Sequence, residues 1–313
     1  MDWIIARPAN LRWASKVFRL YQISGLQSAV RASGLLRPLR LNHWDAQLPP
    51  IPAQPSWQHQ YIPTSTPRAT VGLFTGCVAN VLDPATSSAS IRLLNKLGYK
   101  VQIPPAQVCC GALHQHAGLL DKAAALMRQN LRAFAESQLQ AVISTASGCG
   151  AMLMEYADWL PDDPLAHAFS AKVQDISQYL ANAEWPEGTR PRSSNIGLTV
   201  AVHDPCTLRN VARSADAPYR LLERLADIKL KQLPENNVCC GAAGAYFLTE
   251  PAMANDLRAD KIEHLRRIAP DIVVTSNVGC ALHLAQGVRE SGLRIKITHP
   301  AVLIEKQLQA SGV

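Results

Sequence analysis

The chain has 313 residues, of which 48% are hydrophobic and 18% are charged, a composition that excludes intrinsic disorder and predicts two globular units. No run approaches the roughly 20 apolar residues that span a bilayer, so we expect no transmembrane helix. The first 20 residues mix Arg and Lys into their apolar positions and do not resemble a secretory signal. We therefore expect a cytoplasmic protein whose eight cysteines serve metal or redox chemistry rather than disulfides.

The formal net charge of +7 is concentrated near the start of the chain. Residues 1–50 hold seven Arg and Lys against two Asp, which gives them +5 of that charge. The remaining residues are nearly neutral and carry no nucleic-acid-binding motif, so we expect no nucleic acid partner. The basic excess belongs to one N-terminal segment.

That segment, residues 1–46, predicts a basic amphipathic arm. Apolar residues recur at three- and four-residue steps within 11–40, which indicates one or two helices. Residues 47–70 follow as a Pro-rich linker, with six prolines between 47 and 68 and almost no periodicity. We expect the folded body to begin near Val71. The arm is suited to contact with an acidic membrane surface or with a partner subunit.

The body contains an internal repeat, which we assign to residues 71–190 and 195–313. Cys77 aligns with Cys206 at an offset of 129 residues, and Cys149 aligns with Cys280 at an offset of 131. Between them, the motif VCCGA occurs at 108–112 and again at 238–242, an offset of 130. Four cysteines with matching flanks in register predict two copies of one structural unit.

Strand and helix patterns alternate within each half. In the first half we expect strands at 71–74, 100–103 and 141–145 and helices at 84–97 and 118–137. In the second half we expect strands at 199–203, 229–233 and 271–276 and helices at 214–227 and 251–268. This order predicts an α/β fold of two tandem βαβαβ-type repeats with short parallel sheets. Three short strands bury little area alone, so we expect the halves to pack about a pseudo-twofold axis.

All eight cysteines follow predicted strands, at the sheet edge where α/β proteins bind ligands. Four thiolates from three loops suit a multi-iron centre, and adjacent cysteines can reach different metal atoms. Gly111 and Gly241, after each pair, lack a Cβ and allow the backbone N–H groups to approach a bound cofactor. We expect these glycines to contact the cofactor, and we expect eight metal ligands: Cys77, Cys109, Cys110, Cys149, Cys206, Cys239, Cys240 and Cys280.

Three other interpretations of the cysteines stay open. Buried cysteines also act as small hydrophobic side chains, although recurrence of four in register argues against this. Four thiolates also suit structural zinc, but the short C-x₂₋₄-C spacings of most zinc sites are missing. The vicinal pairs are also consistent with thiol–disulfide catalysis.

Several residues near the cysteines have both a functional and a structural interpretation. Four histidines are candidate ligands or proton donors, although a hydrogen-bonded or surface role is more common: His114, His116, His203 and His283. Tyr246 and Phe247 are expected to pack over the second site and exclude water. Arg209 and Asn210 are candidate donors to a cluster, or ordinary polar residues of a helix start.

The motifs resemble those of the cysteine-rich CCG domain proteins, which include heterodisulfide reductase subunits and the iron–sulfur subunit of glycolate oxidase. The glycolate oxidase subunit is the more similar, through four segments: 145–160 (TASGCGAMLMEYADWL), 204–210 (DPCTLRN), 238–249 (VCCGAAGAYFLT) and 275–284 (TSNVGCALHL). The resemblance covers roughly residues 11–310, with residues 11–70 a looser match to that family's linker.

Two departures from the family pattern are visible. Glycolate oxidase subunits carry a two-cluster ferredoxin segment, whereas no cysteine precedes Cys77 here. We therefore expect a split subunit, a truncated product, or a ferredoxin-like subunit or domain supplied in trans. Heterodisulfide reductases have a fifth cysteine in each motif, but Ala146 and Asn277 occupy those positions. One [4Fe–4S] cluster per repeat is the simpler expectation.

The resemblance implies an electron-transfer subunit of a flavin-dependent 2-hydroxy-acid oxidase or dehydrogenase of the glycolate or lactate type. A separate FAD-binding subunit would oxidise the substrate, because this chain lacks a dinucleotide-binding G-x-G-x-x-G fingerprint. We expect no catalytic residue in the chain itself. The alternatives are a heterodisulfide-reductase-like subunit that reduces a disulfide at a cluster, or a zinc-stapled assembly subunit.

Overall fold

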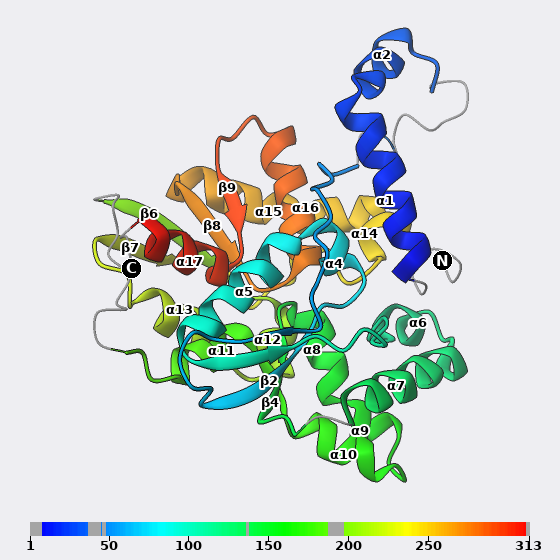
Figure 1. Ribbon diagram of the computed structural model, residues 1–313. Helices are drawn as coiled ribbons and strands as arrows, with labels where there is room; N and C mark the ends of the chain where they lie inside the picture. The colour runs from blue at the N-terminus through cyan, green and yellow to red at the C-terminus, as the bar shows by residue number, and fades with distance from the viewer. Residues whose placement is uncertain (1–7, 37–44, 46–47, 136–137, 187–196, 311–313) are drawn as a thin grey trace.

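The frame of the molecule is a pair of β-sheets, one from each half of the chain (Figure 1). The computed structural model describes residues 8–36, 45, 48–135, 138–186 and 197–310. Each sheet has four parallel strands with helices on both faces. This confirms the predicted α/β fold of tandem repeats.

The first unit alternates strands and helices from residue 69 to residue 182. Its strands are β2 (Ala69–Phe74), β3 (Tyr99–Gln102), β4 (Ala141–Ser144) and β5 (Val173–Asp175). Its helices are α4 (Val78–Leu82), α5 (Pro84–Lys96), α6 (Ala112–His116), α7 (Leu120–Ala135), α8 (Ser147–Met154), α9 (Tyr156–Trp159), α10 (Pro164–Ser170) and α11 (Ile176–Asn182).

The second unit repeats this plan from residue 198 to residue 310. Its strands are β6 (Leu198–His203), β7 (Ile228–Gln232), β8 (Ile272–Thr275) and β9 (Lys296–Thr298). Its helices are α12 (Cys206–Asn210), α13 (Ala217–Leu222), α14 (Tyr246–Thr249), α15 (Pro251–Ile268), α16 (Val278–Glu290) and α17 (Pro300–Ala310).

The two sheets have the same strand order and equivalent registers. The parallel strands run β3–β2–β4–β5 in the first unit and β7–β6–β8–β9 in the second. Phe74 pairs with Ser144 at the carboxyl ends of β2 and β4, and His203 pairs with Thr275 at the corresponding ends of β6 and β8. These registers identify equivalent positions in the two repeats, and Phe74 corresponds to His203.

The ends of α5 follow from local sequence. Asp83 accepts a hydrogen bond from the backbone N–H of Thr86, and Pro84 takes the first helical position, where its missing N–H is harmless. Gly98 follows the helix with φ +85°, a conformation that side chains with a Cβ rarely adopt. The predicted helix start and stop are therefore confirmed.

Four helices pack between the sheets and join the repeats. Helix α5 of the first unit packs against α17 of the second, and α13 of the second packs against α11 of the first. Their apolar residues and those of β2, β4, β6 and β8 form one hydrophobic core. Arg92 on α5 also forms an ion pair with Glu305 on α17, at 2.5 Å. Reciprocal pairing of equivalent helices is the packing expected about a pseudo-twofold axis.

The sheets have more strands than the three per repeat that the sequence pattern predicts. Strands β5 and β9 extend them on the β4 and β8 sides. In addition, β1 (Gln60–Tyr61) pairs antiparallel with β3, so the Pro-rich segment contributes to the sheet. These strands have two or three residues, too few for an alternating pattern to be recognised. The helix expected at 214–227 is shorter, because α13 spans Ala217–Leu222.

The N-terminal arm is a pair of helices, α1 (Pro8–Ile23) and α2 (Leu26–Ser33), that project from the α/β body (Figure 1). Gly25 separates them with φ +77°. Trp13 is 65% exposed and Phe18 is 44% exposed, so much of the apolar face of α1 is uncovered. Residues 37–40 of the predicted helical region lie outside the described residues. No helix in the described ranges is long and apolar enough to cross a membrane.

Candidate metal centres

Each cysteine lies at the carboxyl edge of its sheet, as the strand order predicts. Cys77 follows β2 and precedes α4, Cys109 and Cys110 lie in the loop between β3 and α6, and Cys149 is in the first turn of α8. The second unit places its cysteines in the same way: Cys206 at the start of α12, Cys239 and Cys240 in the loop before α14, and Cys280 in the first turn of α16. All eight, each in the described part of the chain, are free thiols.

In the first set, the thiols contact one another and are mostly buried. The Sγ atoms of Cys77 and Cys109 are 3.4 Å apart. The Cys110 thiol contacts those of Cys109 and Cys149. Cys77, Cys109 and Cys110 are buried, while Cys149 is half-buried. The four predicted residues therefore come together at one point.

The second set is assembled in the same way but is more open. The Cys239 thiol contacts those of Cys206 and Cys240, and Cys240 also contacts Cys280. Cys240 and Cys280 are buried, whereas Cys206 and Cys239 are half-buried. Each repeat therefore gathers its own four thiols at one point of its sheet, so the molecule has two separate groups of four cysteines.

One cysteine of each set is strongly acidified by its neighbours. Hydrogen bonds from the Cys110 and Cys77 thiols lower the pKa of Cys109 to about 3. Those from Cys206 and Cys240 lower the pKa of Cys239 to about 2. The same contacts raise the pKa of Cys77 and Cys110. Cys109 and Cys239 are thus the residues of their sets that lose a proton most readily, and a thiolate is the form of cysteine that binds a metal ion.

The donor set fits an iron–sulfur cluster. Four sulfur ligands from three loops match the thiolate ligation of [2Fe–2S] and [4Fe–4S] clusters, and the surrounding core limits access of water. Phe247 contributes to this shielding, because it packs with Cys240, Cys280 and Leu284. Tyr246, for which the sequence predicts the same role, is instead 37% exposed.

The glycines after the cysteine pairs have the positive φ that the sequence suggests. Gly111 has φ +94° and Gly241 has φ +88°, and the N–H of Gly241 lies 3.4 Å from Cys239 Sγ. A Cβ on Gly241 would lie 2.4 Å from the carbonyl oxygen of Ala254, and one on Gly111 would lie 3.3 Å from that of Ala123. The glycines therefore also let α7 and α15 approach the loops closely.

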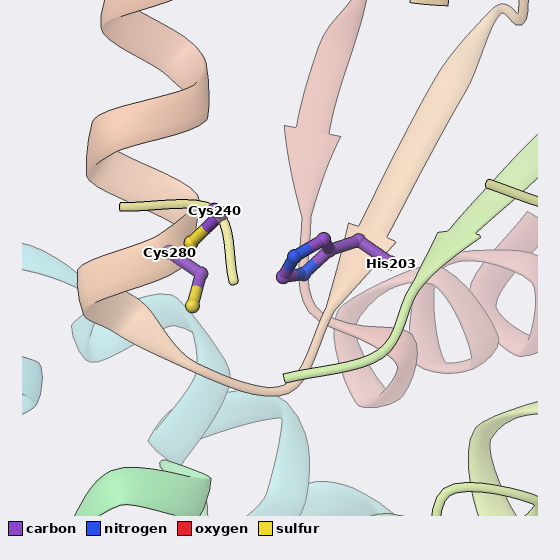
Figure 2. A group of neighbouring side chains, drawn as sticks. All are labelled: His203, Cys240 and Cys280. Carbon is purple, nitrogen blue, oxygen red and sulfur yellow. The ribbon is translucent and has the colours of Figure 1, made fainter. Parts of the chain in front are cut away.

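The histidines near the cysteines fall into different roles. His116 is exposed and His114 is buried beside Cys109. His283 is buried and bonds through Nε2 to the Ala254 carbonyl, 3.0 Å away, which joins α16 to α15. His203 is different, because one of its ring nitrogens and the Sγ atoms of Cys240 and Cys280 all lie within 4.8 Å of one another (Figure 2).

Electrostatics keep His203 neutral. Burial and the nearby Lys261 lower the pKa of His203 to about 4. The imidazole is therefore uncharged at pH 7, which is the form that binds metal ions.

Arg209 and Asn210 hold a loop rather than a cofactor. The Arg209 guanidinium donates hydrogen bonds to the carbonyls of Asn236 and Asn237, and the Asn210 side chain accepts one from Arg209. Arg209 thus fixes the segment that leads into Cys239. Both residues lie at the end of α12 rather than at a helix start, and their hydrogen bonds in the structure are to this loop and to each other.

Sequence reasoning missed the residues that support the first cysteine pair from α7 and α9. Asn130 accepts a hydrogen bond from the Val108 N–H and donates to the Cys109 carbonyl, and the Tyr156 hydroxyl donates to the Cys110 carbonyl. The sequence signal that could have identified Asn130 was its place on the apolar face of the helix predicted at 118–137. In the second repeat, Lys261 takes the position of Asn130, and its Nζ donates to the Glu235 carbonyl at 2.5 Å.

The start of α8, which carries Cys149, touches two cysteine-bearing segments of the second repeat: α12, which carries Cys206, and the loop before Cys280. The Ser147 N–H donates to the Ser276 carbonyl at 2.8 Å, and the Thr207 hydroxyl donates to the Ser147 hydroxyl at 2.9 Å. The two cysteine sets are thus joined by direct contacts between their own loops. Direct contact between equivalent segments agrees with the expectation that the halves pack about a pseudo-twofold axis.

Comparisons with known proteins agree with this architecture. The cysteine-rich domain CCG matches residues 71–154 and 200–285. The linker region of the glycolate oxidase iron-sulfur subunit matches residues 1–48, a range that includes α1 and α2 and ends before the first proline of the Pro-rich segment, Pro49.

Relatives that match most of the chain are named as glycolate oxidase iron-sulfur subunits or as lactate utilization protein A. The chain is 34% identical to a probable glycolate oxidase iron-sulfur subunit of Bacillus subtilis, over 97% of this chain and 70% of that protein. It is 30% identical to the glycolate oxidase iron-sulfur subunit of Escherichia coli, over 98% and 70%. Lactate utilization protein A of Geobacillus thermodenitrificans is 27% identical, over 75% of this chain and 98% of that protein. The chain therefore belongs to the family of glycolate oxidase iron–sulfur subunits, with two cysteine-rich CCG domains.

Proposed function

We propose that the chain is the electron-transfer subunit of a flavin-dependent 2-hydroxy-acid oxidase or dehydrogenase, with one [4Fe–4S] cluster held by each cysteine set. The observation that carries this proposal is the convergence of four thiols at the carboxyl edge of each sheet. The relatives named for glycolate oxidase and lactate utilization support the substrate class. When bound, the clusters would supply one-electron redox chemistry.

The chain's own residues would provide ligands, hydrogen bonds and shielding. Cys77, Cys109, Cys110 and Cys149 would hold the first cluster, and Cys206, Cys239, Cys240 and Cys280 the second. The N–H groups of Gly111 and Gly241 point toward thiolates, where they stabilise negative charge. The buried helices between the sheets keep the two sets at a fixed separation.

We propose that substrate oxidation takes place on a separate FAD-binding subunit. The exposed apolar face of α1, flanked by Arg12, Lys16 and Arg19, is suited to docking within that complex. A ferredoxin-like unit would continue the electron path, since residues 1–76 contain no cysteine. The basic residues that flank this apolar face also suit peripheral contact with an anionic membrane from the cytoplasmic side. Binding of the chain to vesicles with and without anionic lipid would test this contact.

Metal analysis tests the cofactor assignment. We expect the anaerobically reconstituted chain to bind about eight irons and eight acid-labile sulfides, since each set would hold four irons. Cys110→Ser and Cys240→Ser should each retain about half of the iron and half of the sulfide, because each substitution removes a ligand from one site. Stoichiometric zinc without iron would contradict the proposal and favour the zinc-stapled alternative.

Flavin reduction in the reconstituted complex tests the division of labour. Cys110→Ser or Cys240→Ser should abolish reduction of an electron acceptor while substrate still bleaches the flavin under anaerobic conditions. The reason is that hydride transfer to the flavin needs no group from this chain. Loss of bleaching in the Ser variants, or oxidation of glycolate or lactate by the isolated chain, would contradict the relay role.

A further inference from the structure

His203 lies in the second site although it is not one of the repeated cysteines. It is the last residue of β6 and is 2% exposed. Figure 2 shows its imidazole directed toward the thiols of Cys240 and Cys280. One ring nitrogen and the two Sγ atoms all lie within 4.8 Å of one another. This is the spacing of side chains that hold a common metal centre.

The first repeat has no donor at this position. Sheet register makes Phe74 the equivalent of His203, since both end the central strand and pair with the last residue of the next strand. Phe74 is buried and packs with Cys77, Cys109 and Cys110. An apolar ring therefore fits this fold position, and packing alone does not require a histidine there. The two repeats differ by one potential nitrogen ligand.

A second contact orients the imidazole for ligation. His203 Nδ1 is 2.9 Å from the hydroxyl oxygen of Thr275, its partner in the sheet register. Histidines that bind metals usually donate their other ring N–H to an oxygen, which fixes the tautomer and leaves the opposite nitrogen unprotonated. In the first repeat, the equivalent Ser144 hydroxyl donates to the Ala146 carbonyl instead.

We propose that His203 binds the metal centre of the second site through Nε2, so that this site has mixed nitrogen and sulfur ligation while the first has sulfur alone. This inference rests on the proposed function, because it takes the cysteine sets as metal ligands. When the neutral imidazole takes the place of one thiolate at the cluster, the centre carries less negative charge, and His in place of Cys raises the reduction potential of iron–sulfur centres. The second site would then accept electrons from the first.

The experiment uses the full chain, reconstituted anaerobically with iron and sulfide after labelling its histidines with ¹⁵N. Cys110→Ser disables the first site, so pulsed EPR of the reduced variant reports on the second. We expect a strong hyperfine coupling, of the size of a directly bound nitrogen, that changes with the ¹⁵N label. In Cys240→Ser, which leaves the first site, this coupling should be missing.

His203→Phe installs the first-repeat residue and should remove the coupling, while His299→Gln, at a buried histidine that follows β9, should not. His203→Gln serves as a second variant in case the Phe variant fails to fold, and the label comparison itself needs no variant at His203. Normal iron and sulfide content without a histidine coupling would overturn this inference alone. No iron bound in any variant would overturn both it and the proposed function.

Discussion

The two cysteine sets occupy equivalent places in equivalent sheets, yet their surroundings differ in polarity. Around the first set, Phe74, Met127 and Asn130 have no ionisable group. The equivalent positions of the second repeat hold His203, Arg258 and Lys261, all buried. The repeat thus preserved the cysteines and the backbone frame, while the side chains that set the local electrostatic potential diverged. We therefore expect the two cysteine sets to share one architecture and to differ in local electrostatic potential.

The glycines give the largest expected difference between the repeats. Gly241→Ala would place a Cβ 2.4 Å from a backbone carbonyl, so the loop or α15 must move. We expect a loss of about 3 kcal/mol or more in the free energy of unfolding, together with the iron of the second site. Gly111→Ala, at 3.3 Å, should lose about 1–2 kcal/mol, mainly from its positive φ.

Denaturant titration and iron analysis of both variants measure this difference. Gly118→Ala is a control, since Gly118 has a positive φ but a Cβ added there would meet nothing within 4 Å. Equal losses at Gly111 and Gly241 would show that φ alone, and not the approach of α15, requires glycine.

The caps of α11 and α17 should respond to pH in opposite directions. Asp175 accepts a hydrogen bond from the Ser177 N–H, and the equivalent His299 accepts one from the Ala301 N–H. Burial raises the pKa of Asp175 to about 6 and lowers the pKa of His299 to about 3. The second polar side-chain atom of these residues, Asp175 Oδ2 in one and His299 Nε2 in the other, is buried and has no hydrogen-bond partner.

For Asp175, the folded state holds its proton more tightly than the unfolded state, so the stability it contributes is lost as pH rises from about 4 to 6. For His299, the unfolded state takes up a proton below about 6.5 while the folded state does not, so stability is lost as pH falls below that value. Asp175→Asn should therefore gain about 2 kcal/mol relative to the parent between pH 4 and 7. His299→Asn should gain about 2 kcal/mol relative to the parent between pH 7 and 5.

Unfolding free energies measured from pH 4 to 8 separate these two effects. In both variants the Asn side chain offers an oxygen that can accept the capping hydrogen bond, in place of Asp175 Oδ1 or His299 Nδ1. A pH-independent difference from the parent therefore reports the cap, and the pH-dependent part reports the charge. Parallel profiles for parent and variants would contradict the assigned titrations.

The smallest expected effect concerns the charge at Lys261. Replacing it with Met removes a cation near Cys239 and Cys240, and this loss favours the more oxidised, less negative state of the centre. We expect the reduction potential of the second site to fall by an amount on the order of 1 kcal/mol per electron, with the first site unchanged. Potentiometric titration followed by EPR measures both sites in one sample. Lys306→Met, at an exposed position on α17, controls for net charge, and an equal shift there would contradict a local effect.

The repeat was the part of the structure most accessible from sequence. Cysteine spacing, the duplicated VCCGA motif and strand–helix alternation predicted the parallel sheets and the edge where all eight thiols meet. The short strands β1, β5 and β9 escaped prediction, because two or three residues that pair with a distant strand carry no periodic signal. Helix α13 was overestimated for a related reason, since its apolar pattern continues into Leu225, which is buried in the core beyond the end of the helix.

Sequence by itself determined where the clustered thiols of this protein come from, because the number and spacing of its cysteines are visible in the linear pattern. Only the tertiary structure decided what surrounds those ligands. His203 is three residues from Cys206 in sequence, but the nearby thiols are those of Cys240 and Cys280. Phe74 and His203 became comparable only through strand register, and Asn130 and Lys261 only through the approach of α7 and α15 to the glycine turns. These relations arise from parallel pairing and helix packing between residues distant in the chain, which no local pattern encodes.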